Sequence, residues 1–336
     1  MSIVPSPDCS ASSRGRFRLF ISRLDGRYEA AIREGLEYVG LVSRLRPGDR
    51  VFVKPNLTYP TYRPGVMTSP EAVEALIRVL GDYAVRITVG EADSGGYNPF
   101  SMSEVFRATG LEEMARRYGV DLVNLTHAPS RPLRIRSGLR RLEVPLPVRV
   151  LDDTDWFVSM PVPKVHMNTG VSLTLKNQWG LIQVPAARLR LHPYFSDVVY
   201  EINRALPPSV SVVDGRFGLT RSGPLRGDPL ELDWLMVADN LFAADYACCH
   251  LMGIPTSSVP YLSEALDREG IQRLAQLEWS QESAPFCSTG FYLKRAWTDL
   301  PGLFAFKSRI AAYVGYESPL AGLLHKILYL FREPFY

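Results

Sequence analysis

The chain has 336 residues, of which 46% are hydrophobic and 22% are charged, and its formal net charge is +3 at pH 7. These fractions are typical of a globular protein, and so small a net charge gives no reason to expect a nucleic-acid partner. The length allows one large domain or a domain with an elaborated second lobe, and the sequence contains no run of about 18 apolar residues that would span a bilayer.

Residues 1–16 are rich in serine, proline and arginine and lack an apolar stretch, so we expect a flexible tail and not a secretory signal. The four cysteines have neither the spacing of metal ligands nor that of a disulfide framework. Adjacent Cys248 and Cys249 fall within an apolar helical pattern, which is typical of buried thiols. These features predict a cytoplasmic protein.

The first half of the chain alternates short apolar strands with amphipathic helices. The predicted strands cover residues 17–21, 50–54, 85–90, 120–125 and 156–160, and the predicted helices cover residues 28–44, 70–83 and 103–118. An arginine-rich hairpin is predicted over residues 133–150, with its basic side chains on a solvated face. Such alternation is typical of α/β folds, in which ligands bind at the carboxyl ends of strands.

Polar residues follow several of these strands. Lys54-Pro55-Asn56 ends the second strand, and the third ends in Glu91, with Asp93 close behind. Lys164 and His166 come soon after the last of these strands, next to two prolines. Only six of the 38 basic residues are lysines, so a lysine at a strand end indicates a need for a compact or titratable positive charge.

The second half of the chain continues the pattern. The predicted elements are helices over residues 194–206 and 242–252 and strands over residues 210–213 and 234–238. Asp214-Gly215 ends a strand, and the glycines that follow at positions 218, 223 and 227 predict a loop in which the backbone closely approaches a ligand or another strand. Asp245 lies near the start of a helix, where the helix dipole favours an acid.

The leucine-rich residues 304–336 predict an amphipathic helical tail that packs on its own domain, with a membrane surface or a partner protein as the alternative.

Several motifs, in order along the chain, resemble the domain of unknown function 362 family. They include a Lys-Pro-Asn strand end, a Pro-Lys-x-His run and a Lys-Asn-x-x-Gly run, and the similarity covers roughly residues 51–270. The matched segments are 53–56, 90–91, 163–166, 175–180, 192, 213–215 and 244–245. The resemblance implies an α/β domain and no particular reaction.

The chain departs from the pattern of this family in two places. Some members carry a cysteine-rich ferredoxin-like module or cluster motif, whereas this chain has no Cys-x-x-Cys, so we expect no iron–sulfur cluster. Val165 and Met167-Asn168 stand where members often have more basic or hydroxylic residues. The resemblance therefore does not predict which substrate this chain would take.

Together these features predict a layered α/β/α domain over residues 17–303, with a mainly parallel or mixed sheet and a small β-hairpin elaboration. A C-terminal helical tail is predicted over residues 304–336. The ligand cleft is expected at the carboxyl ends of the strands. The oligomeric state is left open, and a homo-oligomer is compatible with the sequence.

The polar residues predict an enzyme that acts on a small anionic substrate bearing a carboxylate or a phosphate. The candidates for acid–base or electrostatic catalysis are His166, His192, Lys164 and Lys176. The candidates for substrate binding are Lys54, Asn56, Asn177, Gly180 and Gly215. The candidate oxygen ligands for a divalent cation are Glu91, Asp93 and Asp214.

Other interpretations of the same residues stay open. A strand-end histidine is more often a satisfied structural residue than a catalyst, Asp214 can cap a turn, and Glu91 can pair with a lysine. The alternative functions are a non-catalytic ligand-binding or membrane-surface scaffold protein, and a hydroxy-acid racemase or isomerase. The latter rests on a similarity of residue type to the nickel-pincer lactate racemases. The sequence contains no Walker-type loop and no Gly-x-Gly-x-x-Gly after a first strand, which argues against an NTP or NAD site.

Overall fold

The computed structural model describes residues 17–94, 98–328 and 330–331. The tail predicted over residues 1–16 lies outside this part of the chain. Within the described residues, no helix has the length and apolar character needed to cross a membrane.

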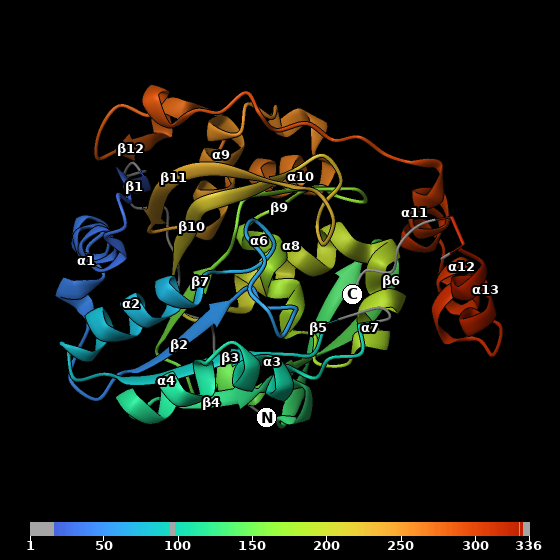
Figure 1. The fold of residues 1–336 in the computed structure, drawn as a ribbon, viewed down its shortest axis with the longest axis horizontal. Coiled ribbons are helices and arrows are strands. Elements are labelled where there is room, and N and C mark those ends of the chain that lie inside the picture. Colours follow the sequence, from blue (N-terminus) through green and yellow to red (C-terminus); the bar gives the residue numbers. More distant parts are fainter. Residues whose placement is uncertain (1–16, 95–97, 329, 332–336) are drawn as a thin grey trace.

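A mixed sheet runs through the centre of the molecule, with the strand order β12-β1-β11-β10-β7-β2-β3-β4 (Figure 1). These strands are β1 (Phe17–Arg23), β2 (Arg50–Pro55), β3 (Arg86–Glu91), β4 (Asp121–Asn124), β7 (Trp156–Met160), β10 (Ser209–Thr220), β11 (Asp228–Ala238) and β12 (Leu277–Trp279). The neighbours from β10 to β4 pair in parallel, whereas β11 is antiparallel to both β10 and β1. Strand β8 (Lys164–His166) pairs with β10 and with β9 (Gly170–Ser172). The predicted α/β class with a mainly parallel or mixed sheet is therefore confirmed.

Helices cover both faces of the sheet and create two hydrophobic cores. One core contains side chains of α1 (Tyr28–Tyr38), α2 (Pro70–Gly81), α3 (Met102–Ala108) and α4 (Leu111–Tyr118). The other contains side chains of α6 (Thr174–Asn177), α8 (Phe195–Ala205), α9 (Leu241–Leu251) and α10 (Pro260–Glu269). Because side chains alternate along a strand, Val51 and Val53 of β2 enter the first core while Phe52 enters the second.

The predicted hairpin is a separate two-stranded sheet of β5 (Ser130–Ser137) and β6 (Arg140–Pro147), followed by the short helix α5 (Val148–Leu151). Its arginines at positions 134, 136, 140 and 141 are exposed, as expected of a solvated face. The C-terminal helices are α11 (Leu300–Lys307), α12 (Arg309–Ala312) and α13 (Ala321–Leu328), with the π-helical turn Tyr313–Glu317 between the last two. In Figure 1 these C-terminal helices are drawn in red, and they lie at one end of the molecule next to α7 (Pro185–Leu191).

Two predicted helices are shorter than their apolar periodicity indicates. The helix predicted over residues 28–44 ends at Tyr38, and Gly40 adopts a φ of 71° before a separate 3-10 turn. The helix predicted over residues 103–118 is divided into α3 and α4 at Gly110, which has a φ of 79°. In both places a glycine in the left-handed conformation ends a helix, because it bears no Cβ that would oppose that turn.

The glycines after Asp214 do not all lie in a loop, which corrects the prediction. Strands β10 and β11 are longer than their apolar cores and form one extended hairpin, so that Gly218 lies within β10. Gly223 lies in the connection, against the carbonyl oxygen of Val165, where a Cβ would collide with it. The expected close approach to another strand is therefore present, and it holds the hairpin against β8.

Candidate functional site

A cavity of about 250 Å³ opens at the carboxyl ends of β2 and β3, next to β8 and α6. Parallel strands β2 and β3 end at the same edge of the sheet, and the chain after β7 returns over this edge. The predicted residues that line the cavity are Asn56, Glu91, Lys164, Lys176, Asn177, Gly180 and His192. The structure thus brings together residues that are more than a hundred positions apart in the chain.

A buried ion pair lies behind one wall of this cavity. Lys54 Nζ is 2.6 Å from Glu91 Oε2, and their side chains are 0% and 6% exposed. Burial lowers the pKa of Lys54, and the Glu91 carboxylate opposes that effect. A Cβ at Gly180 would lie 2.9 Å from Lys54 Nζ, so glycine lets the chain pass over the pair. Lys54 was predicted to bind substrate, but it is not among the residues that line the cavity.

Asn177 connects this ion pair to helix α6. Its Nδ2 donates to the carbonyl oxygen of Lys54 at 3.2 Å and to Ser159 Oγ at 3.0 Å, and its Oδ1 accepts from Lys54 Nζ at 3.4 Å. A buried acid anchors the other end of the same helix, since Asp245 accepts from the backbone N–H groups of Thr174 and Leu175 at 2.7 and 3.2 Å. Asp245 therefore caps α6, and burial raises its pKa to about 7.

The two lysines that line the cavity are held differently. Lys164 Nζ donates to the carbonyl oxygen of Val66 at 2.6 Å and to Asn56 Oδ1 at 3.0 Å. Burial, reinforced by the charges of Lys176 and Lys54, lowers the pKa of Lys164 to about 7. The side chain of Lys176 is partly exposed, and within the described residues its amine has no hydrogen-bond or ion-pair partner. Burial and the neighbouring Arg188 lower the pKa of Lys176 to about 7 as well.

Both predicted histidines are neutral imidazoles at pH 7. His166 is buried, and its Nδ1 accepts from the backbone N–H of Asn168 at 3.1 Å, which leaves the proton on Nε2. Burial lowers the pKa of His166 well below its usual value, and the charges of Lys176 and Lys164 act in the same direction. His192 lines the cavity, and burial together with the charge of Lys176 lowers its pKa to about 3.

His192 is part of an aromatic stack. Its ring lies 5.7 Å from the ring of Trp179, nearly parallel to it, and 4.7 Å from the ring of Phe306 in α11. The same imidazole also borders a second cavity of about 470 Å³, walled by the aromatic rings of Tyr194, Phe195, Tyr261 and Phe306. In the described part of the chain, the Tyr261 hydroxyl and Asn168 Oδ1 next to this cavity have no hydrogen-bond partner.

Arg188 and Trp179 line the cavity but were not among the predicted site residues. The Arg188 guanidinium donates to the carbonyl oxygens of Ile182, Asp93 and Gly180 at 2.6, 2.7 and 3.1 Å. Burial lowers the pKa of Arg188 to about 10, so it stays charged at neutral pH. An arginine in a short helix rich in arginine gives no sequence signal that separates it from solvated neighbours.

His166, although buried near Lys164 and Lys176, is not among the residues that line the cavity, and three further predicted residues lie elsewhere. Asp93 Oδ1 accepts from the backbone N–H of Met102 at 2.6 Å, at the start of α3. Asp214 accepts from the Tyr28 hydroxyl and from the backbone N–H of Ser69, both at 2.8 Å. Gly215 packs directly under the ring of Trp234.

The predicted cation site is therefore not assembled. Glu91 is paired with Lys54, while the carboxylates of Asp93 and Asp214 accept hydrogen bonds from backbone groups in different parts of the fold. Among the residues that the structure describes, no group of three or more histidine, cysteine or acidic side chains is arranged to hold a metal ion.

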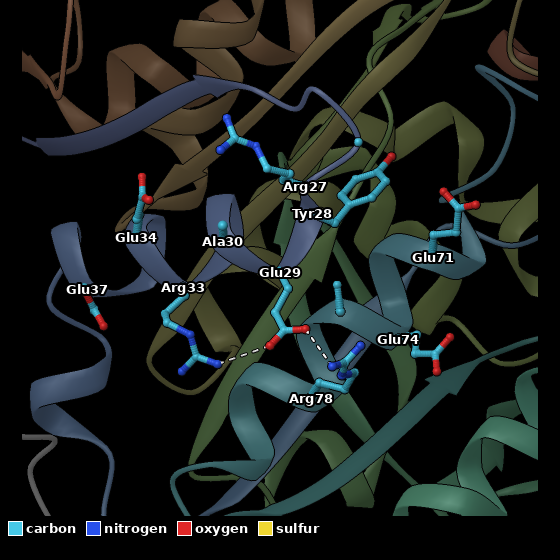
Figure 2. A pocket seen from close by; sticks show the side chains of 12 residues that line it. Arg27, Tyr28, Glu29, Ala30, Arg33, Glu34, Glu37, Glu71, Glu74 and Arg78 are labelled. Carbon is cyan, nitrogen blue, oxygen red and sulfur yellow. Dashed lines mark hydrogen bonds and ion pairs between the residues drawn. The ribbon is translucent and has the colours of Figure 1, made fainter.

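A larger hollow between α1 and α2 holds none of the predicted residues (Figure 2). Its centre is occupied by Glu29, which pairs with Arg33 at 3.5 Å and with Arg78 at 3.1 Å. Acidic and basic side chains pair there, and acidic residues are in excess, since five glutamates and three arginines line the hollow. The cavity beside Lys176 has the opposite character, because its one acidic lining residue, Glu91, is already paired with a lysine.

The structure defines an α/β protein with a cavity at the strand ends that is lined by Lys164, Lys176 and Arg188. Residues 51–250 match the family described as Domain of unknown function (DUF362), and the chain belongs to this family. The resemblance of the sequence motifs is thereby confirmed.

The individual proteins and solved structures that resemble this chain have low sequence identity to it. The thylakoid-associated protein sll1697 of Synechocystis sp. is 24% identical over 271 residues, which cover 74% of this chain and 77% of the relative. A crystal structure of a Thermotoga maritima protein gives a TM-score of 0.45 at 17% identity and covers 69% of this chain. The lactate racemase apoprotein of Thermoanaerobacterium thermosaccharolyticum gives 0.41 at 14% identity and covers 70% of it. This chain covers only 59% and 56% of those two structures.

Proposed function

We propose that the cavity beside Lys176 is the active site of an enzyme that acts on a small anionic molecule bearing a carboxylate or a phosphate. The observation that carries the proposal is the imbalance of charge in the cavity wall. Lys164, Lys176 and Arg188 line it, whereas its acidic lining residue, Glu91, is neutralised by Lys54. An anion entering the cavity would supply the missing negative charge.

Two of these cations have a pKa that suits proton transfer. A lysine with a pKa of about 7 is present in both protonation states near neutral pH, so it can bind an anion as an ammonium or accept a proton as an amine. Lys176 is the better candidate for general base, because its amine lines the cavity without a partner among the described residues, while Lys164 is held by two acceptors. Arg188, with a pKa of about 10, provides a permanent charge for binding.

The roles differ from those expected from the sequence, where the histidines were the proposed acid and base. With a pKa of about 3, His192 is not an acid that can donate a proton at pH 7, and it fits a role as a neutral hydrogen-bonding group beside the substrate. His166 is held by a backbone N–H and is buried close to both lysines, which supports a positioning role. Its loss would weaken the site indirectly.

The test is ligand-dependent melting of the full chain with a panel of carboxylates and phosphates, followed by a search for conversion of each ligand that binds. A bound anion at 100 times its Kd stabilises the folded state by about 2.7 kcal/mol. Lys176→Met should abolish conversion and weaken binding. The matched control is Lys326→Met, an exposed lysine in α13, which should behave as wild type.

The outcomes separate the alternatives. Binding without conversion of any ligand would favour the non-catalytic ligand-binding protein. Exchange of the α-hydrogen of a 2-hydroxy acid in D₂O would identify the narrower racemase or isomerase alternative. If no anion raises the melting temperature of the wild-type chain, or if Lys176→Met leaves every shift unchanged, the proposal is wrong.

A further inference from the structure

The C-terminal segment exposes far more apolar surface than the rest of the protein. Among the described residues, sixteen large hydrophobic side chains are exposed, and twelve of them lie between Trp297 and Phe331. We call these twelve side chains the C-terminal apolar surface; examples are Phe304 at 66%, Ile310 at 78% and Leu330 at 79% exposure. So many exposed apolar side chains in one segment favour an interaction site, because monomeric proteins rarely leave large apolar patches in water.

The segment already uses its other side to pack on the domain. Ala305 and Ala312 are buried, and Phe306 lies against His192 and Phe195 at ring distances of 4.7 and 5.3 Å. On the outer side of α11, Leu300 and Phe304 are exposed apolar side chains, and Lys307 is the exposed charged side chain at the end of the helix. A helix that is apolar on both sides is expected to be buried on both. In the part of the chain that is described, nothing covers the outer side.

Basic side chains predominate around this surface. Lys307, Arg309 and Lys326 are exposed there, whereas the side chain of Asp299 is buried. The sequence from Lys294 to the end contains six basic and three acidic residues, so this segment carries an excess of three positive charges, equal to the net charge of the whole chain. Trp297 and Tyr313 add the amphipathic rings that favour a boundary between water and hydrocarbon.

We propose that the C-terminal apolar surface binds the surface of a lipid bilayer that contains anionic lipids. The helices α11 and α13 have eight residues each, far fewer than the roughly 20 needed to cross a bilayer, so they would lie in the headgroup region. The exposed basic side chains complement lipid phosphates. The same basic side chains disfavour a contact between two copies of this chain, because the positive charges of one copy would face those of the other across a symmetric interface.

The experiment is co-sedimentation of the full chain with vesicles of phosphatidylcholine, with and without phosphatidylglycerol. Binding to the anionic vesicles should be stronger by about ten-fold and should weaken at high salt. The double variant Leu323→Ser with Ile327→Ser should lose binding at both compositions. Lys307→Gln with Arg309→Gln should lose mainly the preference for anionic lipid. The matched controls are Leu139→Ser and Arg140→Gln, exposed residues of the β5–β6 hairpin.

The result that would overturn the proposal is wild-type binding by the Leu323→Ser, Ile327→Ser variant, or no binding of the wild-type chain to either vesicle. A concentration-dependent dimer that this variant abolishes, seen in sedimentation velocity without lipid, would instead assign the surface to a contact between copies. Because the substituted side chains are exposed, the variants should keep the wild-type melting temperature. Lys176→Met should still bind vesicles, which keeps this test independent of the proposed active site.

Discussion

Lys54 Nζ and Glu91 Oε2 lie 2.6 Å apart in a buried ion pair next to Gly180, with Glu91 in the wall of the cavity. This pairing leaves the cavity with unneutralised positive charge, because Glu91 is its acidic lining residue and Lys54 already balances it. It also provides a rigid floor, since Asn177 bonds to the Lys54 side chain and backbone at once. The pair thus forms the base of the proposed site, in which Lys164, Lys176 and Arg188 line the cavity.

Removing the carboxylate of this pair should destabilise the protein strongly. Glu91→Gln leaves the Lys54 amine buried without a counter-charge, so we expect a loss of about 3–5 kcal/mol in the free energy of unfolding. The matched control is Glu71→Gln, which breaks the exposed pair with Arg216 and should cost about 1 kcal/mol or less. Urea denaturation at pH 7 measures both. Equal losses in the two variants would contradict a structural role for the buried pair.

Anion binding should weaken as the pH rises above neutrality. Lys164 and Lys176 each have a pKa of about 7, so above that pH they lose the protons that attract the ligand. Each proton that must be regained on binding weakens affinity up to about ten-fold per pH unit. Sulfate is a suitable probe for calorimetry between pH 6 and 9, because its own charge is constant there.

A charge-preserving variant isolates the contribution of Lys176. The guanidinium of Lys176→Arg stays protonated at these pH values, so its affinity for sulfate should fall less steeply with pH than that of the wild type. The control Lys326→Arg changes an exposed lysine of α13 and should follow the wild-type curve. A sulfate affinity that is constant with pH, or that falls equally in Lys176→Arg and the wild type, would show that Lys176 does not titrate in the site.

Much of the site could be predicted from the sequence, because parallel strands end at a common edge. Asn56, Glu91 and Lys164 follow or form such strand ends, and they do meet in one cavity. Asp93 and Asp214 also follow strands, but each accepts hydrogen bonds from nearby backbone N–H groups and is thereby used in the fold. A strand-end position predicts proximity to the edge, and it does not predict which group is left free.

The protonation states could not be predicted, because they depend on burial. The usual pKa values of histidine and lysine assign acid–base chemistry to His192 and charge to Lys176. Burial beside other cations reverses this assignment, with a pKa of about 3 for His192 and about 7 for Lys176. Asp245 was likewise expected to stabilise its own helix α9, whereas its carboxylate caps α6, a contact between segments about seventy residues apart.

Asp245 should affect anion binding without touching the anion. In Asp245→Asn the side-chain oxygen can still accept one N–H at the start of α6, but the amide group offers a donor to the second, so we expect a loss of about 1–3 kcal/mol in stability. The displaced helix should also lower the affinity for sulfate, because α6 carries Lys176 and Asn177. The control Asp228→Asn removes an exposed partner of Arg221 and should change neither quantity. Unchanged sulfate affinity in a destabilised Asp245→Asn variant would limit Asp245 to a role in stability.

The second cavity should accept an aromatic group attached to the anion. His192 borders both cavities, and the second is walled by Phe195, Tyr261 and Phe306. Burying a ring of phenylalanine size is worth about 1.5–3 kcal/mol, so phenyl phosphate should bind at least about ten-fold more tightly than inorganic phosphate. Phe306→Ala should reduce this difference while leaving the affinity for inorganic phosphate unchanged. The control Phe331→Ala changes an exposed ring outside the cavity and should keep the full difference. Equal affinities of the wild-type chain for the two phosphates would show that the ligand occupies the first cavity alone.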